Sequence, residues 1–297
     1  ELLRDTEVIR YSSTIGVNTL ITKTGSKIGL IVTKGYKESL YSEDPALREP
    51  IYDFISQDMI VEIEEEIDEA GNVLTTIKEE EILEKMQYLI DIGARAIAVS
   101  LRNSHVNPVH ERQIKNTIKK QYPTFFLGSV KVFLASEISD QPGDFCRTNT
   151  VVLNGYIHDS LVRYLYKAED DLRAKFYQHP LMVSHSSGGV TRVAKTRAID
   201  TCSSGPALGV IGAGMFGNIY GLKNVLTADI GGTSFDLGLI RGGVYSYGIT
   251  PSVCGLPVSI SMIETYSAPI ASCSIAHIDN SKNLKIGPQS AGAKPGP

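Results

Sequence analysis

The sequence predicts an α/β fold, because short β-branched runs alternate along the chain with segments whose apolar residues recur at helical spacing. Residues 28–33 (IGLIVT) and 94–101 (ARAIAVSL) are typical of buried strands. Residues 78–93 and 107–123 show the apolar spacing of helices, and the first of these ends at Gly93. This order of strand, helix, strand and helix favours a parallel sheet with right-handed crossovers.

Length and composition limit the kind of protein. With 297 residues, of which 42% are hydrophobic and 21% charged, the chain can form one large or two ordinary globular domains. The net charge of −4 argues against nucleic acid as the main partner, since phosphate backbones select basic surfaces. No apolar run reaches the roughly 18 residues of a membrane span, and we expect no secretory leader, since no charged segment followed by an apolar one is found.

The cysteines and the chain ends add two expectations. Four cysteines lie far apart without a CxxC pair, which is typical of reduced thiols in a cytoplasmic protein; they are Cys146, Cys202, Cys254 and Cys273. The chain begins with ELLRDTEVIRYSS, without a methionine, and stops at GAKPGP. We therefore expect it to be part of a longer polypeptide.

Residues 1–145 are expected to form the first domain. A helix ending at Gly25 precedes the first strand, and residues 59–77 alternate apolar and acidic residues around the turn DEAGN. We expect this segment to be a half-solvated hairpin, with the acidic run at residues 62–69 on its exposed face. A break is expected near residues 140–150, where DQPGD interrupts the pattern.

Residues 146–297 are expected to form the second domain. A long amphipathic helix runs toward residue 176, and residues 180–190 (PLMVSHSSGGV) are typical of a strand that ends in a turn. Residues 203–221 carry small residues on an expected helix, which indicates that something approaches its backbone closely. Residues 224–249 are typical of a hairpin.

The most informative segment is TADIGGTSFDLGLI at residues 227–240, where glycines, hydroxyl residues and acids interrupt an apolar run. Glycines let backbone N–H groups approach an anion, hydroxyls add donors, and carboxylates beside a phosphate require a cation such as Mg²⁺. The candidate phosphate cradle consists of Gly231, Gly232, Thr233 and Ser234, flanked by Asp229 and Asp236. The alternative is a hairpin with a glycine bulge and ordinary surface acids.

The segment SSGPALGVIGAG, starting at residue 203, is a second candidate. Its functional interpretation is a helix N-terminus directed at a phosphate, with Ser204 and Gly205 supplying free N–H groups. Its structural interpretation is a helix that packs closely on a neighbour. The segment precedes the first motif closely in sequence, so both could serve one ligand.

Other polar residues have simpler interpretations. His185 in SHSSGG is expected in a hydrogen-bonded loop, and this string lacks the GxSxG pattern of serine hydrolases. His105 and His110 are expected at a helix start and on the surface, without a further ligand for a metal. Asp140 and Asp144 bracket QPG in an expected turn.

Seven stretches, in order, resemble the hydantoinase A family, which holds ATP-dependent hydantoinases, 5-oxoprolinases and one subunit type of the acetone and acetophenone carboxylases. The stretches are SKIGLIVTKGYKESL, EIDEAGNVLTTI, NSHVNPVHERQI, RTNTVVLNGYI, SSGPALGVIGA, ADIGGTSFDLGLI and GPQSAGAKPGP. They cover the chain nearly end to end. Seven ordered stretches are far more specific than one glycine turn, and they favour the phosphate interpretation of residues 227–240.

The resemblance implies the actin/Hsp70/sugar-kinase-like ATPase fold, in which two α/β lobes close around a nucleotide cleft. In that fold DIGGTSFD is similar to the second phosphate-binding hairpin. Asp229 and Asp236 would then act at Mg²⁺ and the terminal phosphate of ATP, and residues 231–234 would line the phosphate chain. Phosphoryl transfer of this kind depends mainly on positioning and electrostatics. The expected cofactors are ATP and Mg²⁺.

The chain departs from the family pattern at two places. The family's earlier glycine-rich strand of DxGGTxxD type, the first phosphate hairpin, is not among these residues. After SMIETYS the family continues with a run of glycines, where this chain reads APIASCSIAHID. Those positions hold Ala268, Pro269 and Ala271 in place of flexible glycines. The resemblance therefore does not extend to nucleotide contacts made by this loop.

Two branches of the family are candidates. VSHSSGGVTRVAKTRAIDT and RYSSTIGVNTL resemble the carboxylase subunits, so we expect an ATP-dependent subunit of an acetone- or acetophenone-type ketone carboxylase that activates its substrate by phosphorylation. The alternative is an ATP-dependent hydantoinase or 5-oxoprolinase that opens a cyclic amide, and a second alternative is a non-catalytic scaffold. Either enzyme branch implies a hydantoinase B-type partner subunit, on a separate chain or fused, within a hetero-oligomer.

Overall fold

The computed structural model describes residues 2–123, 125, 129–232, 234–248, 250–268 and 270–292. The chain forms two compact units, each built from several segments that alternate along the sequence. The first unit comprises Glu1–Val183, Val190–Cys202 and Ile249–Ile260. The second comprises Ser184–Gly189, Ser203–Gly248 and Ser261–Pro297.

A four-stranded parallel sheet forms the centre of the first unit, with the strand order β3-β2-β6-β7. Its strands are β2 (Ile28–Thr33), β3 (Ile60–Ile63), β6 (Ala96–Ser100) and β7 (Lys131–Leu134). All residues of β2 and β6 are buried, because a parallel strand is covered on both faces, and this is why both strands read as continuous apolar runs. The predicted α/β class and both predicted strands are confirmed.

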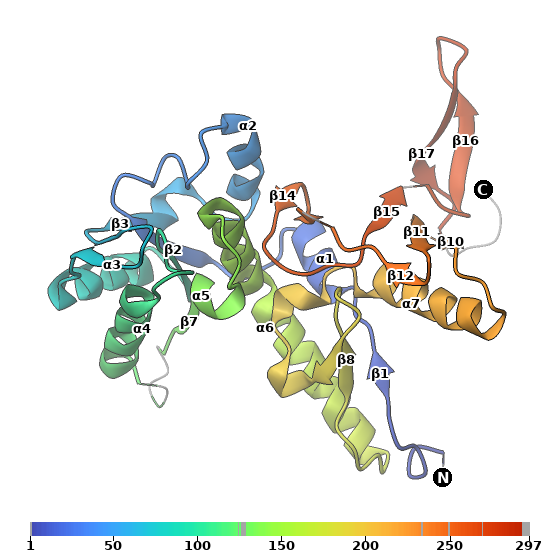
Figure 1. The fold of residues 1–297 in the computed structure, drawn as a ribbon, viewed down its shortest axis with the longest axis horizontal. Coiled ribbons are helices and arrows are strands. Elements are labelled where there is room, and N and C mark those ends of the chain that lie inside the picture. Colours follow the sequence, from blue (N-terminus) through green and yellow to red (C-terminus); the bar gives the residue numbers. More distant parts are fainter. Residues whose placement is uncertain are drawn as a thin grey trace. The chain divides into compact units, whose positions relative to one another are not determined.

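The first unit also contains helices, several of which contact this sheet. Their bounds are α1 (Ile15–Ile21), α2 (Pro45–Arg48), α3 (Glu79–Asp91), α4 (Val109–Gln121), α5 (Ala135–Ile138) and α6 (Asp144–Ala174), with the 3₁₀ segments η1 (Glu49–Asp53), η2 (Gln57–Met59), η3 (Val193–Lys195) and η4 (Ala198–Thr201). Helices α3 and α4 pack on each other beside β3 and β7, and α6 packs along β6 (Figure 1). The predicted stop of α3 is confirmed, since Gly93 follows it with φ of 101°, a conformation that favours glycine.

Helix α6 has 31 residues and passes through two environments. Residues 147–157 are buried without interruption, whereas the later part of the helix buries only scattered positions. The prediction of an amphipathic helix is therefore wrong for its first half, which packs on β6, α1 and η4. Polar side chains there find partners inside the protein; for example, Asn154 Oδ1 accepts from Ile199 N at 3.1 Å.

The predicted hairpin at residues 59–77 is wrong in its first strand. Residues 60–63 form β3, which pairs with β2 in the parallel sheet, and only β4 (Glu66–Ile67) and β5 (Val73–Thr75) pair as a hairpin. The acidic run is not wholly solvated either, because Glu65 is 4% exposed. Strand β3 buries Ile60, Val61 and Ile63 and leaves only Glu62 half-buried, so it does not have the alternating burial of a half-solvated hairpin strand.

Two small sheets belong mostly to the first unit. Strand β1 (Arg10–Tyr11) pairs in parallel with β8 (Met182–Ser184), and β8 neighbours β9 (Val190–Arg192). Strands β13 (Ser252–Val253) and β14 (Leu256–Pro257) form a tight hairpin. The strand predicted within residues 180–190 is confirmed over 182–184.

The second unit is built on an antiparallel sheet and one helix. The sheet contains β10 (Val225–Ile230), β11 (Phe235–Arg241), β12 (Val244–Tyr245) and β15 (Thr265–Ala268), and helix α7 (Ser204–Ile219) packs on β10 and β11. A separate hairpin consists of β16 (Ser274–Ile278) and β17 (Leu284–Ser290). The predicted helix at 203–221 and the predicted hairpin within 224–249 are confirmed.

The expected domain boundary between residues 145 and 146 stays a prediction. The first compact unit continues through this point, because α6 packs on the parallel sheet. A boundary between two family regions can nevertheless lie inside one compact unit.

Within the part of the chain that the structure describes, no helix has the length and apolar character needed to cross a membrane.

Candidate functional site

The segment at residues 227–240 forms the β10–β11 hairpin, and its register decides how the two acids lie. Asp229 stands directly opposite Asp236, and the next pair along is Ala228 with Leu237. Directly opposed side chains point to the same face of a sheet, with Cβ atoms about 4.5–5.5 Å apart. The two predicted carboxylates therefore lie side by side on one face of the hairpin.

The turn that joins the two strands is closed by its own hydrogen bonds. Gly231 N donates to Ser234 O at 3.0 Å, and the Ser234 hydroxyl donates to Asp236 Oδ2 at 2.9 Å. The other oxygen, Asp236 Oδ1, is buried and has no hydrogen-bond partner among the described residues. A buried acceptor without a partner destabilises the folded state, so this oxygen suits a cation. Thr233, also predicted here, lies outside the described residues.

A pocket of about 360 Å³ lies between this hairpin and helix α7. Both aspartates line it, together with Thr227, Ala228, Leu237 and Thr265 from the sheet and Pro206, Gly209, Val210 and Ala213 from the helix. The small helical residues leave the space open, since a Cβ built on Gly209 would meet nothing within 4 Å. The pocket therefore brings the carboxylate pair and the glycine-rich helix to one site.

The glycine-rich helix α7 also has a packing role. A Cβ at Gly214 would lie 2.5 Å from the Tyr245 hydroxyl, so this glycine permits close packing on the sheet. Ser204 and Gly205 lie in the first turn of α7, as expected, but neither lines the pocket. Their role at a phosphate stays a prediction.

The loop that departs from the family's glycine pattern is anchored to the hairpin. Its first residue, Ala268, pairs with Phe235 at the end of β15. Ser272 then bonds the carbonyl oxygen of Gly231 twice, through its backbone N–H at 3.0 Å and through its hydroxyl at 2.9 Å. Pro269 lies outside the described residues. Ser272 thus holds Gly231, the first residue of the segment 231–234, which we call the candidate phosphate turn.

The residues present fit a magnesium ion bound together with a nucleotide. Among the described residues, no three His, Cys, Asp or Glu side chains are grouped as metal ligands. Mg²⁺ at a nucleotide needs only one or two protein carboxylates, because phosphate oxygens and water complete its shell. Asp229 and Asp236, with the unpartnered Oδ1, meet that requirement.

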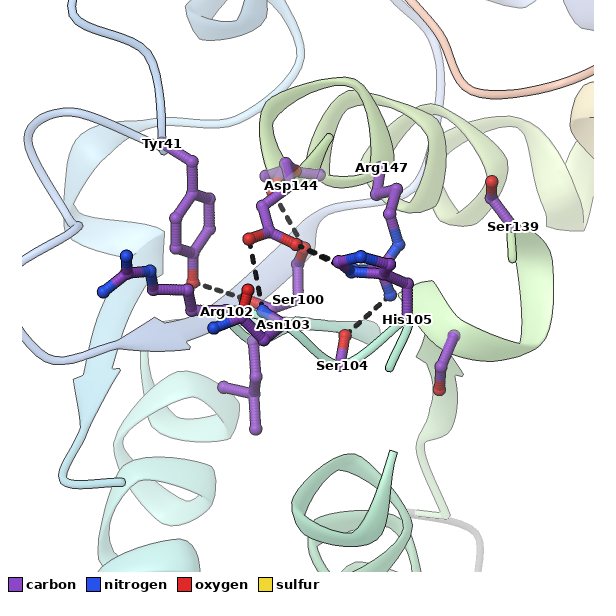
Figure 2. Close-up of polar contacts among 12 residues, drawn as sticks. Tyr41, Ser100, Arg102, Asn103, Ser104, His105, Ser139, Asp144 and Arg147 are labelled. Carbon is purple, nitrogen blue, oxygen red and sulfur yellow. Dashed lines mark hydrogen bonds and ion pairs between the residues drawn. The ribbon is translucent and has the colours of Figure 1, made fainter. Parts of the chain in front are cut away.

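A second charged cluster lies in the first unit, at the start of α6 (Figure 2). Arg147 is fully buried, and it donates to Asp144 Oδ1 at 2.9 Å and to Ser104 Oγ at 2.6 Å. Asp144 also accepts from Asn103 N at 3.2 Å and lies 3.9 Å from His105 Nδ1. Asp144 follows the expected turn, but it is the first residue of α6 and half of a buried ion pair.

Two more carboxylates extend this cluster. Glu111 accepts from Ser104 Oγ at 2.7 Å and from both the N–H and the hydroxyl of Ser136, and its burial raises its pKa above the ordinary value. His110 Nδ1 lies 2.7 Å from Glu65 Oε2. The prediction that His110 is a surface residue is therefore wrong, because the first turn of α4 faces the interior.

Sequence reasoning missed the buried cluster. Asp144, Arg147 and Glu111 are of residue types that are usually exposed, and nothing in their spacing marks them as buried. Only the likeness of NSHVNPVHERQI to a family stretch pointed to this neighbourhood. The contacts indicate a structural role for this cluster. Asp144 pairs with Arg147, and Glu111 accepts from Ser104 in the segment that follows β6.

Comparison with known proteins agrees with the resemblance found in the sequence. The profile of the hydantoinase/oxoprolinase family matches residues 147–297, and that of the hydantoinase/oxoprolinase N-terminal region matches residues 3–122. The acetophenone carboxylase gamma subunit of Aromatoleum aromaticum is 35% identical over an alignment that covers 100% of this chain and 43% of that protein.

Two solved structures have the same fold as this chain. The nucleotide-free structure of acetone carboxylase, from work on ATP-dependent acetone carboxylation, has a TM-score of 0.81 at 26% identity and covers 98% of this chain and 43% of that chain. The ATP-dependent caprolactamase of Pseudomonas jessenii has a TM-score of 0.83 at 29% identity, with 100% and 44% covered. The chain thus spans less than half the length of these relatives. Since both family profiles match in order, the chain belongs to the hydantoinase/oxoprolinase family.

Proposed function

We propose that the second unit is the nucleotide-binding part of an ATP-dependent enzyme with the actin/Hsp70/sugar-kinase-like fold. The observation that carries this proposal is the opposed pair Asp229 and Asp236, which lines a pocket beside a glycine turn and leaves Asp236 Oδ1 without a described partner. The two solved relatives support it, since both are described as ATP-dependent.

Each residue has a role in this proposal. Asp229 and Asp236 would hold Mg²⁺, and the Ser234 hydroxyl keeps the Asp236 carboxylate oriented. Gly232 leaves open space where a Cβ would stand, so a phosphate could reach the backbone, and the sequence offers the Thr233 hydroxyl as a further donor. Gly231 shapes the turn, because its N–H is already bonded to Ser234 O. When bound, Mg²⁺ offsets the charge of the phosphate oxygens during phosphoryl transfer.

We further propose that the full protein is an ATP-dependent subunit of a ketone carboxylase of the acetone or acetophenone type. The terminal phosphoryl group of ATP would pass to the oxygen of the ketone's enol form, with ADP leaving and the enol hydroxyl proton released, so that an inert ketone becomes reactive. The 35% identity to an acetophenone carboxylase gamma subunit supports this branch. A hydantoinase B-type subunit would complete a cytoplasmic hetero-oligomer.

The ATP-dependent opening of a cyclic amide, as by a hydantoinase or 5-oxoprolinase, is the second candidate. The likeness to caprolactamase favours it, with a TM-score of 0.83. ATP hydrolysis by the complete complex separates the two: stimulation by a ketone supports the carboxylase, and stimulation by a cyclic amide supports the amidase. If this chain is instead a scaffold that holds a catalytic sister subunit, replacing Asp229 and Asp236 together should leave the complex fully active.

Calorimetric titration of the full-length protein with Mg-ATP tests the nucleotide site. Wild type should bind, and Asp236→Asn should reduce the affinity at least about tenfold, the scale of one lost ionic contact. Glu264→Gln is a matched control, because Glu264 is an exposed carboxylate of the same unit that does not line the pocket. Equal binding by wild type and Asp236→Asn would refute the proposed site.

A further inference from the structure

The first unit carries polar side chains that the proposed nucleotide site does not use. Strands β2, β3 and β6 run in parallel and end at the same edge of the sheet. In open α/β sheets, ligands bind in the crevice outside the carboxyl ends of the strands. A pocket of about 310 Å³ opens at this edge, and its chemistry is set by Thr33, Lys34, Tyr36, Glu65, Glu66 and Arg102.

Arg102 supplies an unpaired positive charge in this pocket. No described residue accepts a hydrogen bond from its guanidinium, which lies over the Tyr36 ring, 5.6 Å from the ring centre. The main chain is fixed on both sides of it, because Arg102 N donates to Thr33 Oγ1 at 2.9 Å and Asn103 N donates to Asp144 Oδ2 at 3.2 Å. Figure 2 shows the Arg102 side chain directed away from Asp144. Such a preorganised guanidinium suits a carboxylate.

The carboxylates around the pocket are of two kinds. Glu65 is bonded to His110 and to the Thr33 hydroxyl, and Glu64 pairs with Lys34 at 3.1 Å. Glu66, in contrast, is exposed and receives no hydrogen bond or ion pair from any described side chain. The pocket therefore offers one unpaired cation and one unpaired anion, which do not pair with each other.

We propose that this pocket binds a small aminocarboxylate, with its carboxylate on Arg102 and its ammonium group on Glu66. A simple anion would reach Arg102 but would bring its charge close to the surrounding glutamates. A simple amine would reach Glu66 but would lie near Lys34 and Arg102. A zwitterion places each charge beside its opposite and avoids both repulsions.

Calorimetric titration of the full-length protein tests this site. The probes are glycine, β-alanine and γ-aminobutyrate, with propanoate and propylamine as single-charge controls. At least one aminocarboxylate should bind saturably and about tenfold more tightly than either control, as expected for one further charge-assisted hydrogen bond. Arg102→Gln and Glu66→Gln should each lose a similar factor, while Arg112→Gln, an exposed guanidinium on α4, should bind like wild type.

The proposal is overturned if no aminocarboxylate binds saturably, or if Arg102→Gln binds as tightly as wild type. Thermal unfolding establishes that the variants are folded, and Arg102→Lys, which keeps the charge but not the planar fork, should retain part of the affinity. Titration of the same variants with Mg-ATP keeps the two sites distinguishable. A variant that no longer binds the aminocarboxylate but binds Mg-ATP like wild type shows that the change acts at the pocket in the first unit.

Discussion

Asp229 and Asp236 stand directly opposite each other on β10 and β11; the Ser234 hydroxyl donates to one oxygen of Asp236 at 2.9 Å, and no described residue donates to the other. Two carboxylates at opposed positions repel each other and disfavour the hairpin that carries them. Such a pair is consistent with a site that is stabilised by a bound cation.

Replacing Asp229 by asparagine should stabilise the unliganded protein slightly and weaken Mg-ATP binding. Removing one of two opposed like charges relieves a repulsion of about 0.2–1 kcal/mol. Thermal unfolding without nucleotide measures the first effect, and calorimetry with Mg-ATP the second. Glu264→Gln should show neither effect. If Asp229→Asn destabilises the protein and leaves binding intact, the pair is structural.

Replacing Ser272 by alanine should loosen the candidate phosphate turn. The variant keeps the backbone bond to Gly231 O but loses the hydroxyl bond at 2.9 Å. One hydrogen bond contributes about 0.5–1.5 kcal/mol, so Mg-ATP affinity should fall roughly three- to tenfold. Hydrogen exchange at the backbone amides of the turn should become faster.

Two controls accompany the Ser272 variant. Ser272→Thr keeps a hydroxyl and should restore most of the affinity. Ser281→Ala changes a serine in the β16–β17 turn and should leave exchange at the candidate phosphate turn unaltered. Wild-type exchange and affinity in Ser272→Ala would show that the loop does not position the turn.

Replacing Arg147 by methionine should destabilise the first unit strongly. Arg147 is fully buried and pairs with Asp144 at 2.9 Å, so its removal leaves a largely buried carboxylate without its cation. Breaking a buried pair in this way costs about 3–5 kcal/mol, which urea denaturation can measure. Lys167→Met breaks the exposed pair with Asp171 on the same helix and should change stability little. Similar losses in both variants would contradict the expectation.

The buried Glu111 should make stability depend on pH. Its burial raises its pKa above the ordinary value of 4.5, so the folded state holds the proton more tightly than the unfolded state. Its contribution to stability is therefore fully present below pH 4.5 and is lost as the pH rises through the folded pKa. Urea denaturation across this range should show a smaller decrease for Glu111→Gln than for wild type. Parallel curves for the two proteins would contradict the assignment.

Local structure could be read from the sequence where one residue type dominates the outcome. The β-branched run at residues 28–33 predicted β2, and Gly93 predicted the end of α3. The prediction failed at residues 59–77, because the local pattern does not say which strand a segment pairs with: residues 60–63 pair in the parallel sheet, and only β4 and β5 form the hairpin. It failed at His110 because helical spacing does not say which polar residue turns inward.

The sequence by itself determined the class of the protein, the β10–β11 hairpin and the identity of its two aspartates, since glycines and β-branched runs act through local backbone preferences. Only the tertiary structure decided that Ser272 meets Gly231, 41 positions away, and that Arg147 and Glu111 are buried. Such contacts depend on how distant segments pack together, and no local pattern encodes that packing.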